Sequence, residues 1–119
     1  MRVPWWLPFG KVPELGPAEL AGELAGGAPP QLLDVRSRPE FERGHLDGAV
    51  NVPIQELPSR LGSLGFDRGR PVVAICLSGH RSVPAVRLLE RDGFQSARQL
   101  AGGMLANDAW KRRAETARP

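Results

Sequence analysis

The chain has 119 residues, of which 41% are hydrophobic and 24% are charged, and its formal net charge at pH 7 is +3. This length favours one domain with its own hydrophobic core, and the single cysteine excludes an intrachain disulfide framework and a cysteine-rich zinc site. No apolar run approaches the roughly 20 residues of a membrane helix, and the first ten residues contain two prolines and do not resemble a signal peptide. We therefore expect a cytoplasmic protein without a membrane span.

The first half of the chain alternates short apolar segments with turn residues. Residues 1–10 are expected to form an irregular N-terminal arm whose Trp5, Trp6 and Phe9 pack onto the domain, which would occupy residues 11–117. The pattern then predicts a strand over 11–15, a helix over 17–25, a strand over 31–35 and a one-turn helix over 39–43. A strand over 49–52 and a helix over 54–64, interrupted by Pro58, follow.

The second half contains the most apolar segment, residues 71–76, which predicts a parallel strand covered on both faces. A helix is expected to begin at Ser82 as its N-cap and to end at Gly93, followed by a strand over 97–100. The pair Gly102-Gly103 then turns into a final helix that includes Trp110. Alternating strands and helices predict an α/β fold with a parallel sheet and helices on both faces. In such folds the ligand site lies at the carboxyl ends of the strands.

The excess of basic over acidic side chains lies entirely after residue 82, around Lys111, Arg112, Arg113 and Arg118. Binding to nucleic acid strengthens with each phosphate that a basic side chain neutralises, so three surplus charges favour a solvated helix face and no nucleic-acid partner.

Cys76 ends the most apolar strand and opens the loop Leu77-Ser78-Gly79-His80-Arg81 before the helix at Ser82. A short loop that leads into a helix points backbone N–H groups into one concavity, which binds anions and favours a thiolate. Arg81 adds a positive charge at the rim, and Gly79 permits a backbone conformation that other residues resist. The pattern therefore indicates a nucleophilic thiolate that attacks an anionic substrate.

Three segments in collinear order resemble single-domain rhodaneses. Residues 76–82 resemble their Cys-x-x-Gly-x-Arg-Ser loop, residues 32–36 and 40–53 resemble their upstream motif, and residues 100–104 resemble their closing Gly-Gly turn. The resemblance extends over roughly residues 12–115. Here the next tryptophan, Trp110, follows that turn at a greater distance than is usual in the family.

The resemblance implies a rhodanese-like fold with a five-stranded parallel sheet and sulfur transfer through a persulfide on Cys76, without metal or organic cofactor. The donor would be a small anion such as thiosulfate. The acceptor would be cyanide in an assay and a small thiol, thioredoxin or a protein in the cell, because the chain holds no second cysteine to take the sulfur. Residues 77–81 would bind the donor: the backbone N–H groups of Leu77, Ser78, Gly79, His80 and Arg81 would stabilise the charged sulfur, and Arg81 would orient the donor or support the loop.

Asp34, Arg36 and Ser82 are expected to support the site. Asp34 and Arg36 follow a strand, so they either reach the site or form a salt bridge that holds the loops. His45 is expected to satisfy backbone groups rather than act as a base, whereas His80 either adds positive character or faces solvent.

Two alternatives remain open from the sequence. Phosphatases and arsenate reductases also place a cysteine in an anion-binding loop, but their signature separates Cys from Arg by five residues, whereas four residues separate Cys76 from Arg81. Alternatively, the domain is a sulfur carrier or a regulatory module that does not turn over.

Overall fold

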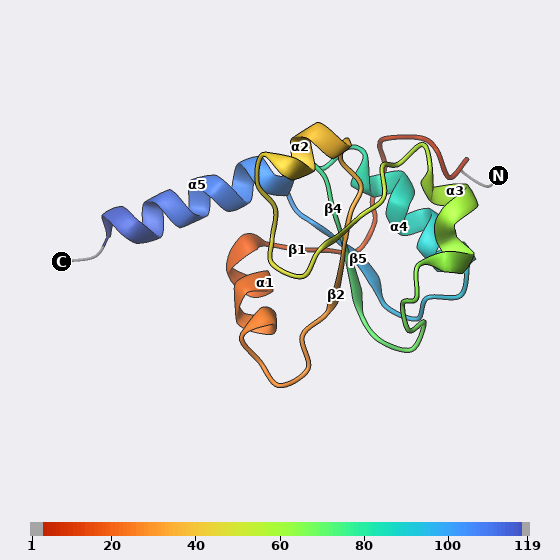
Figure 1. Ribbon diagram of the computed structural model, residues 1–119. Helices are drawn as coiled ribbons and strands as arrows, with labels where there is room; N and C mark the ends of the chain where they lie inside the picture. The colour runs from red at the N-terminus through yellow and green to blue at the C-terminus, as the bar shows by residue number, and fades with distance from the viewer. Residues whose placement is uncertain (1–3, 118–119) are drawn as a thin grey trace.

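The computed structural model describes residues 4–117 and arranges them around one parallel sheet (Figure 1). The strands are β1 (Glu14–Leu15), β2 (Gln31–Asp34), β3 (Val50–Asn51), β4 (Val72–Ile75) and β5 (Ala97–Leu100). The helices are α1 (Pro17–Leu24), α2 (Arg38–Glu42), α3 (Leu57–Arg60), the 3-10 helix η1 (Leu61–Ser63), α4 (Ser82–Arg91) and α5 (Gly103–Thr116).

The five strands are hydrogen-bonded in the order β1-β5-β4-β2-β3, and every pair is parallel. The predicted α/β fold with a five-stranded parallel sheet is therefore confirmed. Because β4 is the central strand, both of its edges are paired and its carboxyl end lies in the middle of one edge of the sheet. That edge is where the loop after Cys76 begins.

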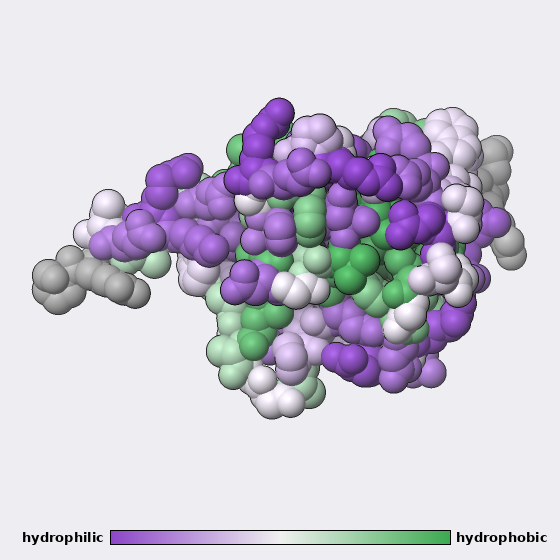
Figure 2. All heavy atoms as spheres, viewed as in Figure 1, coloured by the Kyte–Doolittle hydropathy of each residue, from purple (hydrophilic) through white to green (hydrophobic). Residues whose placement is uncertain are grey.

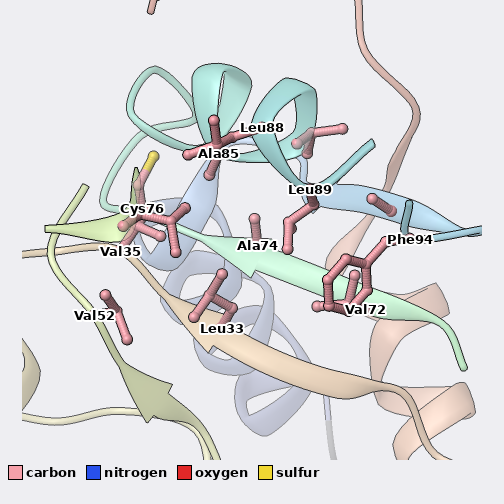
Figure 3. Packing of buried hydrophobic residues seen from close by; sticks show 13 residues of the cluster. Leu33, Val35, Val52, Val72, Ala74, Cys76, Ala85, Leu88, Leu89 and Phe94 are labelled. Carbon is pink, nitrogen blue, oxygen red and sulfur yellow. The ribbon is translucent and has the colours of Figure 1, made fainter. Parts of the chain in front are cut away.

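The central strand β4 divides its side chains between two hydrophobic cores. Val72, Ala74 and Cys76 belong to one cluster and Val73 and Ile75 to the other, as the period of two in a strand requires. The first cluster packs under α4, and Figure 3 shows Ala85, Leu88 and Leu89 above Ala74 and Cys76. The second cluster includes Leu20 from α1 and Met104 from α5. Coverage on both faces explains why this segment is apolar without alternation.

Several of the predicted elements are shorter or less continuous in the structure, and the strand expected over 49–52 comprises only Val50–Asn51. The strand expected over 11–15 comprises only Glu14–Leu15. The helix expected over 54–64 is wrong as a single element: a turn is followed by α3 and then by η1. Pro58 lies in the first turn of α3, where its missing N–H costs no helical hydrogen bond. In the longer helix Pro58 would have been an interior residue.

The N-terminal arm contacts the domain through fewer aromatic residues than expected. Residues 4–10 contain turns and bends but no helix or strand. Trp5 packs against the first hydrophobic cluster, but Trp6 and Phe9 are 60% and 65% exposed, so the expectation that all three would pack was wrong. The Arg87 guanidinium in α4 donates to the carbonyl oxygens of Leu7 and Phe9 and fixes the arm by its backbone. Residues 1–3 of the expected arm lie outside the described residues.

The helix α5 runs beyond the rest of the molecule, as Figure 1 shows. Its outer part is hydrophilic (Figure 2), and Lys111, Arg112 and Arg113 are exposed, as expected for a solvated face; Arg118 lies outside the described residues. Within residues 4–117, no helix is long and apolar enough to cross a membrane.

Candidate active site

Cys76 lies at the carboxyl end of the central strand and is 1% exposed. Figure 3 shows its sulfur pointing from the end of β4 toward the side of the sheet that α4 occupies. The N–H of Gly79 donates a hydrogen bond to the Cys76 sulfur over 3.0 Å. Gly79 has a φ of +94°, a backbone conformation that a residue with a Cβ rarely adopts. The loop thus turns back over the sulfur and directs the Gly79 N–H to it.

The Gly-Gly turn before α5 holds this loop from behind. Met104 N–H donates to the Cys76 carbonyl oxygen over 2.9 Å, and Leu105 N–H donates to the Leu77 carbonyl oxygen over 3.0 Å. These two N–H groups belong to the first turn of α5, where they have no partner within the helix. Gly103 has a φ of +61°, and a Cβ there would meet the Cys76 carbonyl oxygen at 2.4 Å. The sequence predicted only that this pair turns into the final helix, whereas the turn also brings the start of α5 against the backbone of Cys76.

Arg81 is turned toward α2. Its guanidinium donates to the two carboxylate oxygens of Glu40 over 2.6 and 2.9 Å. The Arg81 hydrogen bond lowers the pKa of Glu40 to about 2, with smaller contributions from Ser37, and the same pair raises the pKa of Arg81. Of the two roles expected for Arg81, these contacts fit support of the loop rather than orientation of an anion.

Ser82 does not cap α4, which corrects the sequence expectation. The N-cap position is occupied by Arg81, and Ser82 is the first helical residue and fully buried. Its hydroxyl oxygen lies 3.4 Å from the Cys76 sulfur and 2.5 Å from the Gln99 Oε1. A polar contact between Ser82 and Cys76 therefore replaces the expected cap.

Asp34 and Arg36 form a buried ion pair with each other, at 0% and 5% exposure. The Arg36 Nη2 lies 2.8 Å from the Asp34 Oδ2 and also donates to the Gly44 carbonyl oxygen over 2.7 Å. Asn51 donates to the carbonyl oxygens of both residues. These contacts join the end of β2 to the segment after α2 and match the loop-holding alternative.

The remaining side chains of the loop are more open. Ser78 and His80 are exposed, and the Ser78 hydroxyl lies 3.0 Å from the His80 Nδ1. His45, outside the loop, bonds to the Phe41 carbonyl oxygen over 2.8 Å and stacks on the Phe41 ring. His45 thus satisfies a backbone group, as the sequence predicted.

A cleft of about 500 Å³ lies beside the loop and is lined by Leu77 and Met104. Its other lining residues include the cations Arg36, Arg43 and Lys111 and the acids Glu40 and Asp108. Arg36 pairs with Asp34 and Glu40 pairs with Arg81. The cations Arg43 and Lys111 and the acid Asp108 then leave an excess of one positive charge in the cleft. Sequence reasoning assigned neither residue to the site, because they lie 33 residues before and 35 residues after Cys76. Within residues 4–117, no group of three or more His, Cys, Asp or Glu side chains is placed to hold a metal ion.

Comparisons of the sequence and of the structure with known proteins agree on one protein family. The model of the rhodanese-like domain family matches residues 16–111. The chain is 36% identical over 76 residues to thiosulfate sulfurtransferase GlpE of Shewanella oneidensis, covering 64% of this chain and 73% of that protein. The structure of the human single-domain sulfurtransferase TSTD1 superposes with a TM-score of 0.72 and 30% identity, covering 87% of this chain and 98% of that one.

Other relatives are longer proteins. The HTH-type transcriptional regulator Rv0324 of Mycobacterium tuberculosis is 41% identical over 76 residues, which are 62% of this chain and 32% of the regulator. The chain spans 38% and 23% of the length of two further curated relatives. Related domains therefore occur both as nearly whole proteins and as parts of larger ones.

Proposed function

Because this chain belongs to the family of rhodanese-like domains, we propose that it is a sulfurtransferase that carries sulfur as a persulfide on Cys76 and takes it from a small anion such as thiosulfate. The observation that carries the proposal is the buried Cys76 sulfur beneath the Gly79 N–H, at the carboxyl end of the central strand. A sulfurtransferase relative and a sulfurtransferase structure support the same chemistry.

In the first step the Cys76 thiolate attacks the outer sulfur of thiosulfate. A new S–S bond forms at Cys76, the S–S bond of thiosulfate breaks, and sulfite leaves with the bonding electron pair. The Gly79 N–H, 3.0 Å from the sulfur, stabilises negative charge at this position as an oxyanion hole does for oxygen. Arg43 and Lys111 line the cleft beside the loop, and in this proposal their positive charge attracts the anion toward the loop.

In the second step an acceptor attacks the outer sulfur of the persulfide. Cyanide becomes thiocyanate, or a thiolate becomes a persulfide, and the Cys76 thiolate is released. Since Cys76 is the only cysteine of the chain, the acceptor thiol comes from a small thiol, thioredoxin or another protein. Two ion pairs support this reaction because they hold the loops in place. Arg81 binds Glu40, and Arg36 binds both Asp34 and the Gly44 carbonyl oxygen of the neighbouring loop. We place the protein in the cytoplasm.

The proposal predicts thiocyanate formation from thiosulfate and cyanide, and its loss in Cys76→Ala. The role of the cleft is tested with Lys111→Gln, for which we expect the KM for thiosulfate to rise about two- to fivefold at low salt without a change in kcat. The matched control is Lys11→Gln, an exposed lysine that does not line the cleft. Thiocyanate formation that is equal in Cys76→Ala, or hydrolysis of a phosphate ester in its place, would contradict the proposal.

A second candidate is a regulatory or sulfur-carrying domain without turnover, which the similarity to a transcriptional regulator favours. It predicts that Cys76 accepts one sulfur but that cyanide and thiols do not regenerate the free thiol over repeated cycles. Steady-state kinetics with thiosulfate distinguish the two candidates.

A further inference from the structure

A line of polar side chains leads from Cys76 across the carboxyl edge of the sheet to the surface. The Cys76 sulfur contacts the Ser82 hydroxyl at 3.4 Å, and Ser82 contacts the Gln99 Oε1 at 2.5 Å. The Gln99 Nε2 lies 3.0 Å from the Glu14 Oε1. Ser82 and Gln99 are 0% and 6% exposed, whereas Glu14 reaches solvent. The line connects α4, β5 and β1 to the cysteine.

The chemistry of Glu14 determines the direction of every hydrogen bond in this line. An ionised carboxylate only accepts hydrogen bonds, so Gln99 turns its NH₂ group to Glu14 and its oxygen to Ser82. The single hydroxyl hydrogen of Ser82 is then donated to Gln99, and the lone pairs of Ser82 face the sulfur. In this arrangement Cys76 is the donor, S–H to Ser82. The Ser82 hydroxyl thus presents an acceptor to the sulfur, whereas the Gly79 N–H presents a donor.

Other charged or titratable groups surround Cys76, and each has its own partner in the structure. They are Arg81 with Glu40, Asp34 with Arg36, and His80 with Ser78. The Ser82 hydroxyl is bound only to Gln99 and Cys76 among the described side chains. Turning that hydroxyl hydrogen toward the sulfur would convert Ser82 from an acceptor of the thiol into a donor to the thiolate or persulfide.

We propose that Gln99 and Glu14 are positioning residues that set the direction of the Ser82 hydroxyl and thereby the fraction of Cys76 present as thiolate. The inference rests on the proposed function in that Cys76 is the sulfur-accepting group. It assigns a role to Gln99, which lies 17 positions from Ser82 in sequence, and to Glu14, which lies 85 positions from Gln99.

The test reverses the line with Glu14→Lys. A lysine ammonium only donates, so Gln99 would turn its oxygen to residue 14 and its NH₂ group to Ser82, freeing the Ser82 hydrogen for the sulfur. The measurement is the rate of Cys76 alkylation by iodoacetamide as a function of pH, followed by intact mass. We expect the pH midpoint to fall, with about tenfold more thiolate at a fixed pH below the midpoint.

The control for a long-range charge effect is Glu14→Lys in a protein whose line of hydrogen bonds is already broken. In Gln99→Met no amide connects residue 14 to Ser82, so adding Glu14→Lys to it should leave the midpoint unchanged. Glu90→Lys, an exposed residue near the end of α4, makes the same charge change outside the line. High salt should reduce a long-range charge effect but not the effect of a reversed hydrogen bond. Thermal melting checks that each variant is folded.

An identical midpoint in folded Glu14→Lys and wild type would overturn the inference, as would an equal shift in the Gln99→Met background. The alkylation rate requires no sulfur donor, so the same variants treated with thiosulfate test the proposed function separately. A midpoint shift without any persulfide would support the positioning role and refute sulfur transfer from thiosulfate. A persulfide without a midpoint shift would refute the positioning role alone.

Discussion

At the scale of single residues, two glycines determine where the Cys76 backbone lies. Gly79 lets the loop turn over the sulfur, and Gly103 lets the start of α5 reach the Cys76 and Leu77 carbonyl oxygens. Both have φ values in the left-handed region, which costs a residue with a side chain about 1 kcal/mol or more. The site thus depends on two positions that carry no chemical group.

Gly103→Ala is expected to destabilise the protein by about 2–4 kcal/mol, because the new Cβ would overlap backbone atoms of Cys76 and Leu77 in addition to the strained φ. Urea unfolding measures the change. The matched control is Gly22→Ala within α1, where nothing lies within 4 Å of an added Cβ, so this change should stabilise by up to about 1 kcal/mol. Equal stability of Gly103→Ala and wild type would show that the contact with Cys76 is not tight.

The sequence was sufficient to place Cys76 between a buried strand and a short loop that leads into a helix, because the strand, the cysteine, the glycine and the helix are consecutive. It was not sufficient for the partners of Ser82. A serine at a helix start is typical of a cap, and only the folded sheet shows that Gln99 on a neighbouring strand takes its hydroxyl hydrogen. Arg43 and Lys111 were missed for the same reason, since their place in the cleft depends on how α2 and α5 pack.

At the scale of elements, the loop after β4 is held from two sides. The first turn of α5 binds its carbonyl oxygens, and α2 binds its arginine through Glu40. Short elements such as α2 form few hydrogen bonds of their own, so an ion pair with two hydrogen bonds contributes to the position of both partners. The pair links a five-residue helix to the residue that precedes α4.

The Glu40 and Arg81 pair predicts a pH dependence of stability. In the folded protein the hydrogen bonds from Arg81 lower the pKa of Glu40 from its ordinary 4.5 to about 2. A lowered pKa means that the carboxylate stabilises the fold at pH above 4.5, and this contribution is lost as pH falls from 4.5 to about 2. Glu40→Gln should therefore unfold more easily at pH 7, by up to roughly 1 kcal/mol for a partly exposed pair.

Urea midpoints of wild type and Glu40→Gln at about pH 7, 4.5 and 3 measure this contribution. The difference between the two proteins should shrink as the pH decreases, since the other carboxylates titrate equally in both. A difference that stays constant down to pH 3 would indicate that the ion pair contributes nothing.

The predicted order of elements matched the structure because strands and helices alternate with clear glycine and proline boundaries. The prediction of one helix over 54–64 was wrong because the leucine spacing alone fits a long helix. In the structure Pro58 lies in the first turn of the short helix α3, and η1 follows α3. The spacing of apolar residues alone does not show which backbone N–H groups form helical hydrogen bonds.

At the scale of the whole molecule, the sheet and its two cores hold the site rigidly, while the arm and the end of α5 lie outside them. Residues 4–10 lie along the surface, and their contacts with the domain include the two hydrogen bonds from Arg87 in α4 and the packing of Trp5 against the first hydrophobic cluster. The outer part of α5 is exposed and basic. Removing the arm contacts should therefore affect the arm without unfolding the sheet.

Arg87→Ala is expected to release the arm and to accelerate tryptic cleavage after Lys11 several-fold, because local opening controls proteolysis of such segments. The matched control is Arg91→Ala in the last turn of α4, which should leave cleavage after Lys11 unchanged. The products are identified by mass, and persulfide formation on Cys76 should persist in both variants. Unchanged cleavage in Arg87→Ala would show that Trp5 alone holds the arm.

The most direct test of sulfur transfer is the intact mass of the protein after incubation with thiosulfate under nonreducing conditions. We expect that the wild type gains one sulfur atom, that cyanide or dithiothreitol removes it, and that Cys76→Ala gains none. A wild-type protein that gains no sulfur, or a Cys76→Ala variant that gains as much as wild type, would contradict transfer through a persulfide on Cys76.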